Sequence, residues 1–356
     1  MPTATQLDHK AYIPIAHPGD DVKALFKQYG AVRLHDFKFD TASFDKFVSG
    51  FNETTLTDYS GGYLGKTGRP KTSTNTFEAS NVPPNFYFPP HNDLSYFYEQ
   101  GRMPGIILFC CLTPALKGGY TPLFNAHHAF KLLPDDIVKR IKGRKLSYVW
   151  TIPREGIAGR MKVLPTSWKS FFGTDDPDEV AKLVQDLKFS RHEYLYLGGE
   201  GVSKDEPSHL RLYMDGPMVT QHPTSGKDII FINLGQSPEA RKHFAKHYAS
   251  DEAYQSVIEG SREFLTLDAP YVEWADTHEP IEADVMEAII SAYERSRLDW
   301  GWSQPSESII FDNFLFAHGR DTFEGPRSVI TSFGNIGDHK MPGPDCVAFT
   351  TTSTAA

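Results

Sequence analysis

The order of hydrophobic and polar residues along the chain predicts strands near both ends and helices between them. Nearly continuous apolar runs predict buried strands at 104–114, 226–233, 307–320 and 327–336. Helical patterns occupy parts of 118–143 and 237–265 and most of 40–52, 176–187 and 281–297, and a short helix, a glycine stop and a strand fill 19–37. We therefore expect a mixed α/β protein, mainly β, in which a β core carries a helical insertion at roughly 127–300.

Composition narrows the functional classes. The chain has 356 residues, of which 13% are aromatic, and its formal net charge is −9. This charge argues against nucleic acid or an anionic membrane as the main partner. Cys110 and Cys111 are adjacent, and the three cysteines form neither a disulfide framework nor a CxxC zinc pattern. The N-terminus has no apolar signal core and no run of about 18 apolar residues occurs, so we expect a cytoplasmic protein without membrane spans.

The stretch "NFYFPPHNDLSYF", residues 85–97, places polar side chains within an aromatic run. Its aromatic residues favour a strand, whereas Pro89 and Pro90 cannot donate to a ladder and predict an edge strand or an interrupted one. His91 and Asp93 are two residues apart, and alternate side chains of an extended segment point to the same face. The pair therefore either supplies two ligands to one metal ion or forms an ordinary hydrogen bond.

A third candidate ligand, His318, lies in the apolar run at 307–320, where a buried polar group needs a partner. It is either a core histidine bonded to a carbonyl or a metal ligand. Two histidines and one carboxylate form the facial triad that holds non-haem Fe(II) and leaves three positions open. The sequence thus offers His91, Asp93 and His318 as candidate metal ligands and catalytic centre.

A chelating co-substrate such as a 2-oxo acid needs a cation for its far carboxylate, and the planar guanidinium of Arg suits that role. Arg327 follows His318 across the turn "DTFEGP", so a hairpin would bring it beside the metal-bearing strand. Arg320 is a rival for this role or for binding substrate, and Thr121 offers a hydroxyl from an adjacent strand.

Residues 60–75 have no apolar periodicity and are rich in Gly, Lys and Thr. We expect a mobile loop there, close to the His91 segment. Loops in such places often close over an active site, so this segment is a candidate lid.

These residues lie in ordered motifs that resemble the Fe(II)/2-oxoglutarate-dependent oxygenases of the TauD/TfdA superfamily, above all the SyrP-like branch of natural-product pathways. The motifs are "NVPPNFYFPPHNDLSY" (81–96), "GGYTPLFNAHHAF" (118–130), "SWKSFFGTDD" (167–176), "HPTSGKDIIFIN" (222–233) and "DNFLFAHGRDTFEGPR" (312–327). The resemblance covers roughly residues 60–335. It implies a single oxygenase domain over 1–356, built on a double-stranded β-helix, or jelly roll, with helical insertions.

Carried over by position, the resemblance implies that His91, Asp93 and His318 bind Fe(II). It also implies that Arg327 binds the far carboxylate of 2-oxoglutarate and that Thr121 hydrogen-bonds it. The implied reaction uses O2 to convert 2-oxoglutarate to succinate and CO2 while a C–H bond of a small metabolite is oxidised. Hydroxylation is the default outcome, and desaturation, epoxidation or ring formation would use the same residues.

Two positions depart from the pattern that the resemblance implies. The SyrP-like branch usually has Glu where this chain has Asp93, whereas Asp is usual across the wider superfamily. Taurine dioxygenase carries a second Arg four residues after the one that binds 2-oxoglutarate, and here Thr331 stands there, which argues against a sulfonate substrate. The carboxylate of Asp93 argues against halogenation, which needs an open site for halide at that position.

The substrate is expected to be a small molecule, either free or tethered to a carrier protein. The polar and aromatic candidates to line its pocket, each with a structural role as the alternative, are Tyr63, Arg69, Asn75, Phe77, Asn81, Tyr87, Arg211 and Asn233. Two other functions use the same three ligands: a metal-binding jelly-roll protein without oxygenase activity, and a zinc hydrolase. The complete set of Asp93, His318 and Arg327 argues against the first, and the second would have no need of Arg327.

Overall fold

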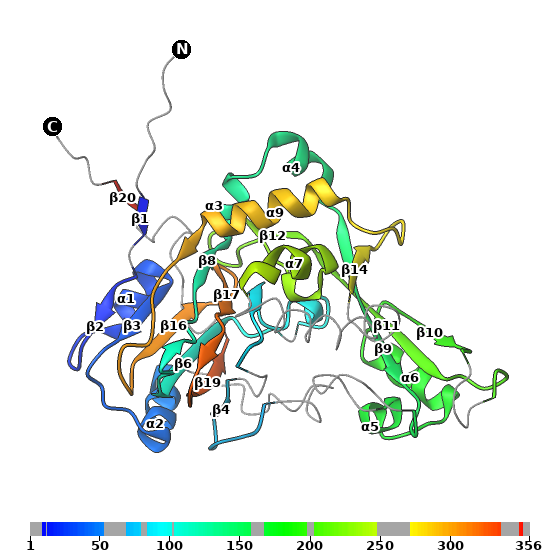
Figure 1. Cartoon of the computed structure of the whole chain (residues 1–356), viewed down its shortest axis with the longest axis horizontal. Coiled ribbons are helices and arrows are strands. Elements are labelled where there is room, and N and C mark those ends of the chain that lie inside the picture. The colour runs from blue at the N-terminus through cyan, green and yellow to red at the C-terminus, as the bar shows by residue number, and fades with distance from the viewer. Residues whose placement is uncertain are drawn as a thin grey trace, which may run out of the picture.

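The computed structural model describes residues 9–11, 13–52, 69–79, 84–101, 103–157, 167–197, 203–247, 271–335 and 349–351. These residues form a mixed α/β structure, mainly sheets, as the sequence predicts (Figure 1). Strands β1 (His9–Ala11) and β20 (Phe349–Thr351) pair antiparallel, so segments from the two ends of the chain lie side by side.

A six-stranded sheet forms one half of the core. In spatial order its strands are β2 (Ile15–Ala16), β3 (Ala31–Leu34), β16 (Ser308–Asp312), β6 (Ile106–Thr113), β19 (Ser328–Gly334) and β4 (Phe77–Glu78). Neighbours pair antiparallel except β2 and β3. Helices α1 (Val22–Tyr29) and α2 (Thr41–Phe51) cover one face, where Phe26 and Phe44 join Leu108 and Ile310 in an apolar cluster. Gly30, with a φ of 71°, ends α1 at the predicted glycine stop.

A four-stranded antiparallel sheet faces the other side of this sheet. Its order is β15 (Arg297–Leu298), β8 (Leu123–Asn125), β17 (Phe316–Arg320) and β5 (Phe88–His91). The ring of His318 on β17 lies 5.4 Å from that of Phe109 on β6 and 5.2 Å from that of Phe311 on β16, so the two sheets pack face to face. Strand β5 is at the edge, which confirms the prediction from its two prolines.

The apolar run at 307–320 is not the one strand that its pattern predicts. It forms β16 in the six-stranded sheet and β17 in the four-stranded sheet, with a turn between them. The turn is built by Asp312, whose Oδ1 accepts the N–H groups of Phe314 at 2.7 Å and Leu315 at 3.1 Å. An aspartate side chain that binds the backbone two residues on is a turn signal that the surrounding apolar residues conceal.

The described part of the insertion at 127–300 contains helices where the pattern predicts them, while residues 248–265 of the predicted stretch 237–265 lie outside the described residues. It also contains a four-stranded antiparallel sheet that the sequence pattern did not predict. The order of this insertion sheet is β10 (Arg191–Leu195), β11 (His209–Pro217), β9 (Lys145–Pro153) and β14 (Tyr271–Trp274). The helices are α3 (Ala126–Lys131), α4 (Asp135–Ile141), α5 (Trp168–Phe172), α6 (Pro177–Asp186), α7 (Pro238–His243) and α9 (Ala283–Arg295). Strands β9 to β11 with α5 and α6 extend away from the six-stranded sheet at the right of Figure 1.

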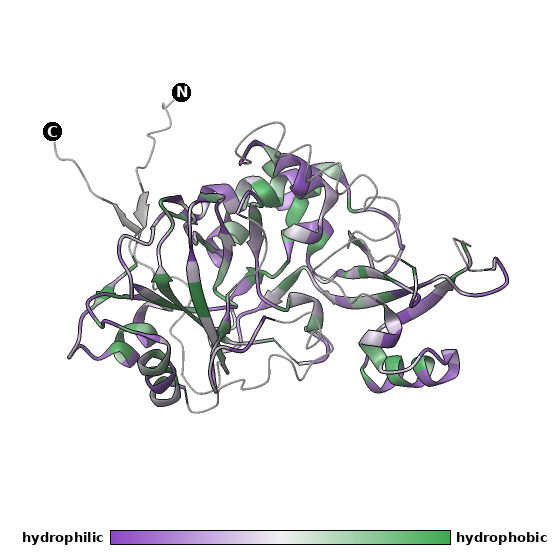
Figure 2. Cartoon of the chain, turned by 60° about the horizontal axis from the view of Figure 1, so that its bottom comes forward, coloured by the Kyte–Doolittle hydropathy of each residue, from purple (hydrophilic) through white to green (hydrophobic). Residues whose placement is uncertain are grey.

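The remaining described elements are short. They are the pairs β12 (Val219–Gln221) with β13 (Asp228–Ile230) and β7 (Lys117–Gly118) with β18 (Phe323–Glu324), and the 3-10 turns η2 (Ser95–Phe97), η3 (Leu234–Gln236) and η4 (Phe244–His247). Hydrophobic residues gather on the central strands in Figure 2, while the helices carry both hydrophobic and hydrophilic positions. Among the described residues, no helix has the length and apolar character needed to cross a membrane.

Candidate metal centre

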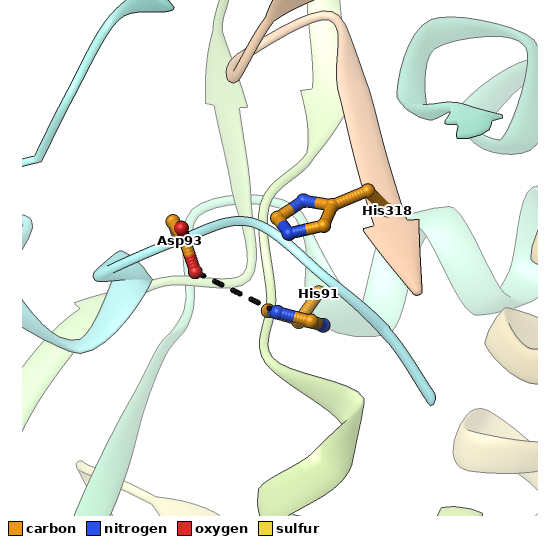
Figure 3. A group of neighbouring side chains, drawn as sticks. All are labelled: His91, Asp93 and His318. Atoms are coloured by element: carbon orange, nitrogen blue, oxygen red, sulfur yellow. Dashed lines mark ion pairs between the residues drawn. The ribbon is translucent and has the colours of Figure 1, made fainter. Parts of the chain in front are cut away.

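His91, Asp93 and His318 converge between the two facing sheets (Figure 3). His91 ends β5 and lies directly opposite His318 of β17 in the ladder, so their ring centroids are 4.3 Å apart. Nε2 of His91 lies 3.6 Å from Oδ1 of Asp93, and one ligand atom from each of the three residues lies within 4.8 Å of the others. Metal bonds of about 2.1 Å at right angles separate two ligand atoms by about 3 Å, so small side-chain movements suffice to close the group on one ion.

The surroundings of both imidazoles suit metal ligands. Nδ1 of His91 donates to the carbonyl of Pro89 at 2.9 Å, and its Nε2 faces Asp93. His318 is 3% exposed, and its Nδ1 has no hydrogen-bond partner among the described residues. Burial, with a smaller effect of His91, lowers the pKa of His318 well below its usual range, so the ring is neutral at pH 7. These features fit a metal ion, which binds neutral imidazole.

The carboxylate of Asp93 is buried but ionised. Burial raises its pKa, but Arg69, His91 and His318 together outweigh burial and hold the pKa well below its usual range. Nη2 of Arg69 lies 3.1 Å from Oδ2 and 3.3 Å from Oδ1 of this carboxylate. The centre therefore combines two imidazoles with one carboxylate whose negative charge is already paired with a guanidinium.

Asparagine side chains fix the backbone that carries the ligands. Asn313 accepts the N–H of Asp93 on Oδ1 at 2.9 Å and donates through Nδ2 to the carbonyl of Asp93 at 3.0 Å. Asn92 donates to the carbonyl of Asn313 at 2.7 Å and accepts the N–H of Ile232 at 3.2 Å. The "HND" and "DN" segments are thus interlocked across the centre. The sequence analysis did not assign these two asparagines, although both lie inside its quoted motifs.

A buried pair of His222 and Asp312 supports the turn between β16 and β17. Nε2 of His222 lies 2.8 Å from Oδ2 of Asp312, and both side chains are fully buried. Because the other oxygen of Asp312 builds the turn between β16 and β17, this pair ties the "HPTSG" segment to the start of the strand that bears His318. The sequence around His222 favours a turn, and its pair with Asp312 carries no local signal, because the two residues are 90 positions apart.

Arg327 and Thr121 lie together, but the expected hairpin does not form. Strand β17 pairs with β5 and β8, whereas β19, which follows Arg327, pairs with β4 and β6 in the other sheet. Nη2 of Arg327 donates to Oγ1 of Thr121 at 3.4 Å, and Nε donates to the carbonyl of Gly119 at 3.0 Å. Gly119 has a φ of 70°, and a Cβ there would approach Cδ of Arg327 to 3.0 Å, so only glycine fits easily. Burial lowers the pKa of Arg327 to about 10, and its guanidinium remains charged at pH 7.

Arg320 lies between the histidines and Arg327. Its guanidinium is 5.1 Å from the ring centroid of Phe88 and 5.3 Å from that of Phe323, and Nη2 donates to the carbonyl of Phe86 at 2.8 Å. The guanidinium of Arg327 lies 5.4 Å from the centroid of the same Phe323 ring. Both arginines thus contact the ring of Phe323, and Arg320 also has a backbone carbonyl as a partner.

Comparison with known proteins identifies the family. Residues 6–332 match the family described as taurine catabolism dioxygenase TauD, TfdA family. The chain belongs to this family.

Two curated relatives of this TauD/TfdA member cover most of its length. Dapdiamide synthesis protein DdaC of Enterobacter agglomerans is 25% identical over 317 residues, which are 88% of this chain and 83% of that protein. A clavaminate synthase-like protein of Arabidopsis thaliana is 22% identical over 315 residues, 87% of this chain and 82% of the relative. The crystal structure of a taurine dioxygenase from Burkholderia xenovorans aligns with 12% identity and a TM-score of 0.49, over 92% of this chain and 88% of the other.

Thr331, four residues after Arg327, faces the interior between the sheets. It lies opposite Phe109 on β6 and Phe77 on β4 in the ladders. Its side chain is fully buried, and its hydroxyl has no hydrogen-bond partner among the described residues. The TauD/TfdA member thus presents a hydroxyl, not a guanidinium, on this strand.

The substrate candidates fall in different places. Arg69 contacts Asp93, and Asn233 forms a backbone bridge with His91, so both lie at the centre. Asn75 instead binds Asp45 and Ser49 of α2. Two further candidates, Tyr63 and Asn81, lie outside the described residues.

The three other candidates lie in an apolar cluster, on the insertion sheet or beside a separate cavity. Phe77 is in the apolar cluster of the six-stranded sheet, with its ring centroid 6.2 Å from that of Phe333. Arg211 lies on β11 of the insertion sheet and donates to Glu193 at 2.7 Å. Tyr87 lines a separate cavity of about 420 Å³, described in the Discussion. The structure brings none of these three to the histidines.

Proposed function

We propose that this protein is an Fe(II)- and 2-oxoglutarate-dependent dioxygenase that oxidises a C–H bond of a small metabolite. His91, Asp93 and His318 would hold Fe(II). The pair of Arg327 and Thr121 would bind the far carboxylate of 2-oxoglutarate. The observation that carries this proposal is the continuous row of Phe88, Arg320 and Phe323, which links the histidine pair to Arg327.

Each residue has a defined task in this proposal. Fe(II), when bound, would supply the activation of O2 that couples conversion of 2-oxoglutarate to succinate and CO2 with oxidation of the substrate. The two imidazoles and the carboxylate of Asp93 would hold the ion as a set of two histidines and one carboxylate. The aromatic rings of Phe109 and Phe311 around His318 exclude water, which strengthens the electrostatic interactions inside.

We also propose that the core is a jelly roll and that the chain forms one oxygenase domain. The two antiparallel sheets that pack face to face, and the chain crossing between them at Asp312, support this assignment. Similarity to a dapdiamide synthesis protein supports a role in biosynthesis, and the quoted motifs support the SyrP-like branch.

The substrate proposal is limited to its chemistry. The hydroxyl of Thr331 replaces the arginine that holds a sulfonate in taurine dioxygenase, so we infer a substrate that offers a hydrogen-bonding group there and no sulfonate. A metabolite screen, with free and carrier-tethered forms, would identify compounds that accelerate succinate formation.

Succinate formation tests the function against its alternatives. The protein loaded with Fe(II) should form succinate from 2-oxoglutarate and O2, and the protein loaded with Zn(II) should not. A zinc hydrolase would show the reverse metal preference on an ester or amide substrate. A non-catalytic metal protein would bind both ions and form no succinate with either.

A further inference from the structure

A cavity of about 420 Å³ lies on the side of strand β17 that faces away from the metal centre. Tyr87 and Phe124, two of its lining residues, belong to the same apolar cluster as Ala317, whereas His318 and Arg320 point to the other side of the strand. No proposed ligand of the metal or of 2-oxoglutarate is among the described residues that line it. A cavity of this volume can hold a small organic molecule, so the chemistry of its walls indicates what it could bind.

One wall of the cavity consists of three aromatic rings. The ring centroid of Tyr87 lies 4.6 Å from that of His247 and 5.5 Å from that of Phe244, and the centroids of Phe244 and His247 are 5.8 Å apart. Burial, with a smaller effect of Lys246, lowers the pKa of His247, so its ring is neutral at pH 7. This wall is therefore uncharged, and it suits the apolar part of a ligand.

Negative charge prevails in the rest of the described lining. It contains two carboxylates, those of Glu294 and Asp321, and one guanidinium, that of Arg297. Nη2 of Arg297 lies 3.0 Å from Oδ2 of Asp321, and Nε lies 2.5 Å from Oδ1 of Asp299. Because two carboxylates already balance the positive charge of Arg297, the cavity disfavours an anionic ligand.

Glu294 offers a carboxylate oxygen to a cation. Its Oε1 lies 2.8 Å from Nζ of Lys246 and 3.1 Å from Nε2 of His243. Its Oε2 has no such partner among the described residues, and the side chain is 34% exposed. When Asp299 and Lys246 are counted with the lining, the carboxylates still outnumber the lysine and arginine side chains. An ammonium group, which donates three hydrogen bonds, fits this oxygen.

We propose that this cavity is a second small-molecule site and that it binds a small organic amine. The apolar part of the amine lies on the wall of Tyr87, Phe244 and His247, and its ammonium group donates to Oε2 of Glu294. Attraction between a cation and aromatic faces adds to this preference. A carboxylic acid of the same shape would meet the carboxylates of Glu294 and Asp321, and an alcohol would lack the charge. The site does not depend on the proposed reaction, because no residue of the metal centre takes part in it.

Calorimetric titration of the full chain with phenethylamine tests the proposal. Phenethyl alcohol and phenylacetate are probes of nearly the same shape, the first neutral and the second anionic. Phenethylamine should bind at least about fivefold more tightly than either of them, as expected for a partly exposed ion pair.

Variants locate the bound amine. Glu294→Gln keeps the size of the side chain and removes its charge, so it should weaken binding of phenethylamine to the level of the alcohol. The matched control is Glu287→Gln, which removes an exposed carboxylate from the same helix α9 outside the described lining and should bind the amine as the wild type does. Tyr87→Leu removes a ring of the wall and should weaken binding of both the amine and the alcohol. Thr331→Val alters the interior between the sheets and should leave the affinity for the amine unchanged.

The proposal is overturned if the wild type does not bind phenethylamine at millimolar concentrations, or if it binds phenylacetate equally tightly. An unchanged affinity for the amine in Glu294→Gln would also overturn it. If Thr331→Val weakens binding of the amine and Glu294→Gln does not, the probe lies between the sheets and the cavity is not its site. None of these titrations involves turnover, so a failure of the proposed oxygenase reaction is recognised separately.

Discussion

Strand β17 has two faces, and its five residues alternate between them. One face looks into the interior between the two sheets, and the other packs in an apolar cluster on the far side of the strand. His318 and Arg320 point into the interior between the sheets, towards Phe109, Phe311 and Phe88. Ala317 instead belongs to the apolar cluster on the other side. This comparison shows how a strand keeps chemical residues and packing residues apart with a period of two.

A cavity of about 420 Å³ lies on that other side. It is lined by Tyr87, Phe124, Phe244, His247, Glu294, Arg297, Asp321 and Thr322. The ring of Tyr87 stacks on His247, with centroids 4.6 Å apart and planes at 14°, and burial raises the pKa of Tyr87 above its usual range. The charged groups here are paired with one another, as Arg297 is with Asp321 at 3.0 Å. The outer face therefore differs from the inner one, where Thr331 has a buried hydroxyl without a described partner.

The largest effect should come from an inner-face ligand. We expect His318→Ala to abolish binding of Fe(II) or Mn(II) at equimolar metal, because one of three ligands is lost. Calorimetric titration under anaerobic conditions measures this. The outer-face control is Asp321→Asn, which should bind metal as the wild type does. Equal metal affinity in His318→Ala and the wild type would remove His318 from the centre.

The next effect compares two arginines near the same ring. We expect Arg327→Ala to raise the KM for 2-oxoglutarate by at least about tenfold, because hydrogen bonds to charged groups contribute about 1.5–3 kcal/mol. Arg320→Ala should raise it less, since Arg320 already donates to the carbonyl of Phe86. Steady-state succinate assays measure both. If Arg320→Ala has the larger effect, the two roles have been exchanged.

A third test concerns the turn that sends the chain from one sheet to the other. His222→Ala would leave the fully buried carboxylate of Asp312 without its imidazole partner, which costs about 3–5 kcal/mol of unfolding free energy. Urea unfolding measures this loss. The control is His243→Ala, which removes a half-exposed pair with Glu294 and should cost less than about 1 kcal/mol. Equal losses in both variants would show that the buried pair does not secure the turn.

The sequence predicts the chemical residues better than their surroundings. His91, Asp93 and His318 meet in one group, and Arg327 meets Thr121 in another. The spacing of His91 and Asp93 is a local property that the sequence records, whereas the expected hairpin between His318 and Arg327 does not form, because β17 and β19 lie in different sheets. The split of 307–320 into β16 and β17 was not predicted, since an apolar run does not show where the chain changes sheets. The insertion sheet was missed for a related reason: its strands pair over long separations in sequence.

For Tyr87, too, the sequence does not predict which face of the sheet the side chain occupies. It lies four residues before His91, close enough in sequence to suggest a shared site, but it lies on the far face of the sheet. The face of each residue near the bulged pairing of β5 and β17 cannot be counted from His91, because the register shifts there.

The smallest expected effect compares Tyr87 with its neighbour Phe88. Phe88 lies on the inner side, with its ring 5.8 Å from that of His91 and 5.1 Å from the guanidinium of Arg320. Phe88→Leu should raise the KM for 2-oxoglutarate a few-fold, because it loosens Arg320 and the wall beside His91, each through contacts of about 0.5–1 kcal/mol.

Tyr87→Leu removes a ring of similar size from the outer side, where it packs against Phe244 and His247. It should lower the unfolding free energy by about 1–3 kcal/mol and leave the KM for 2-oxoglutarate and the affinity for metal within about twofold of the wild type. Urea unfolding, succinate assays and metal titration on the two variants give the comparison directly. A larger change of KM in Tyr87→Leu than in Phe88→Leu would mean that the outer cavity communicates with the centre, and the separation of the two faces would fail at the residue where the structure draws it most clearly.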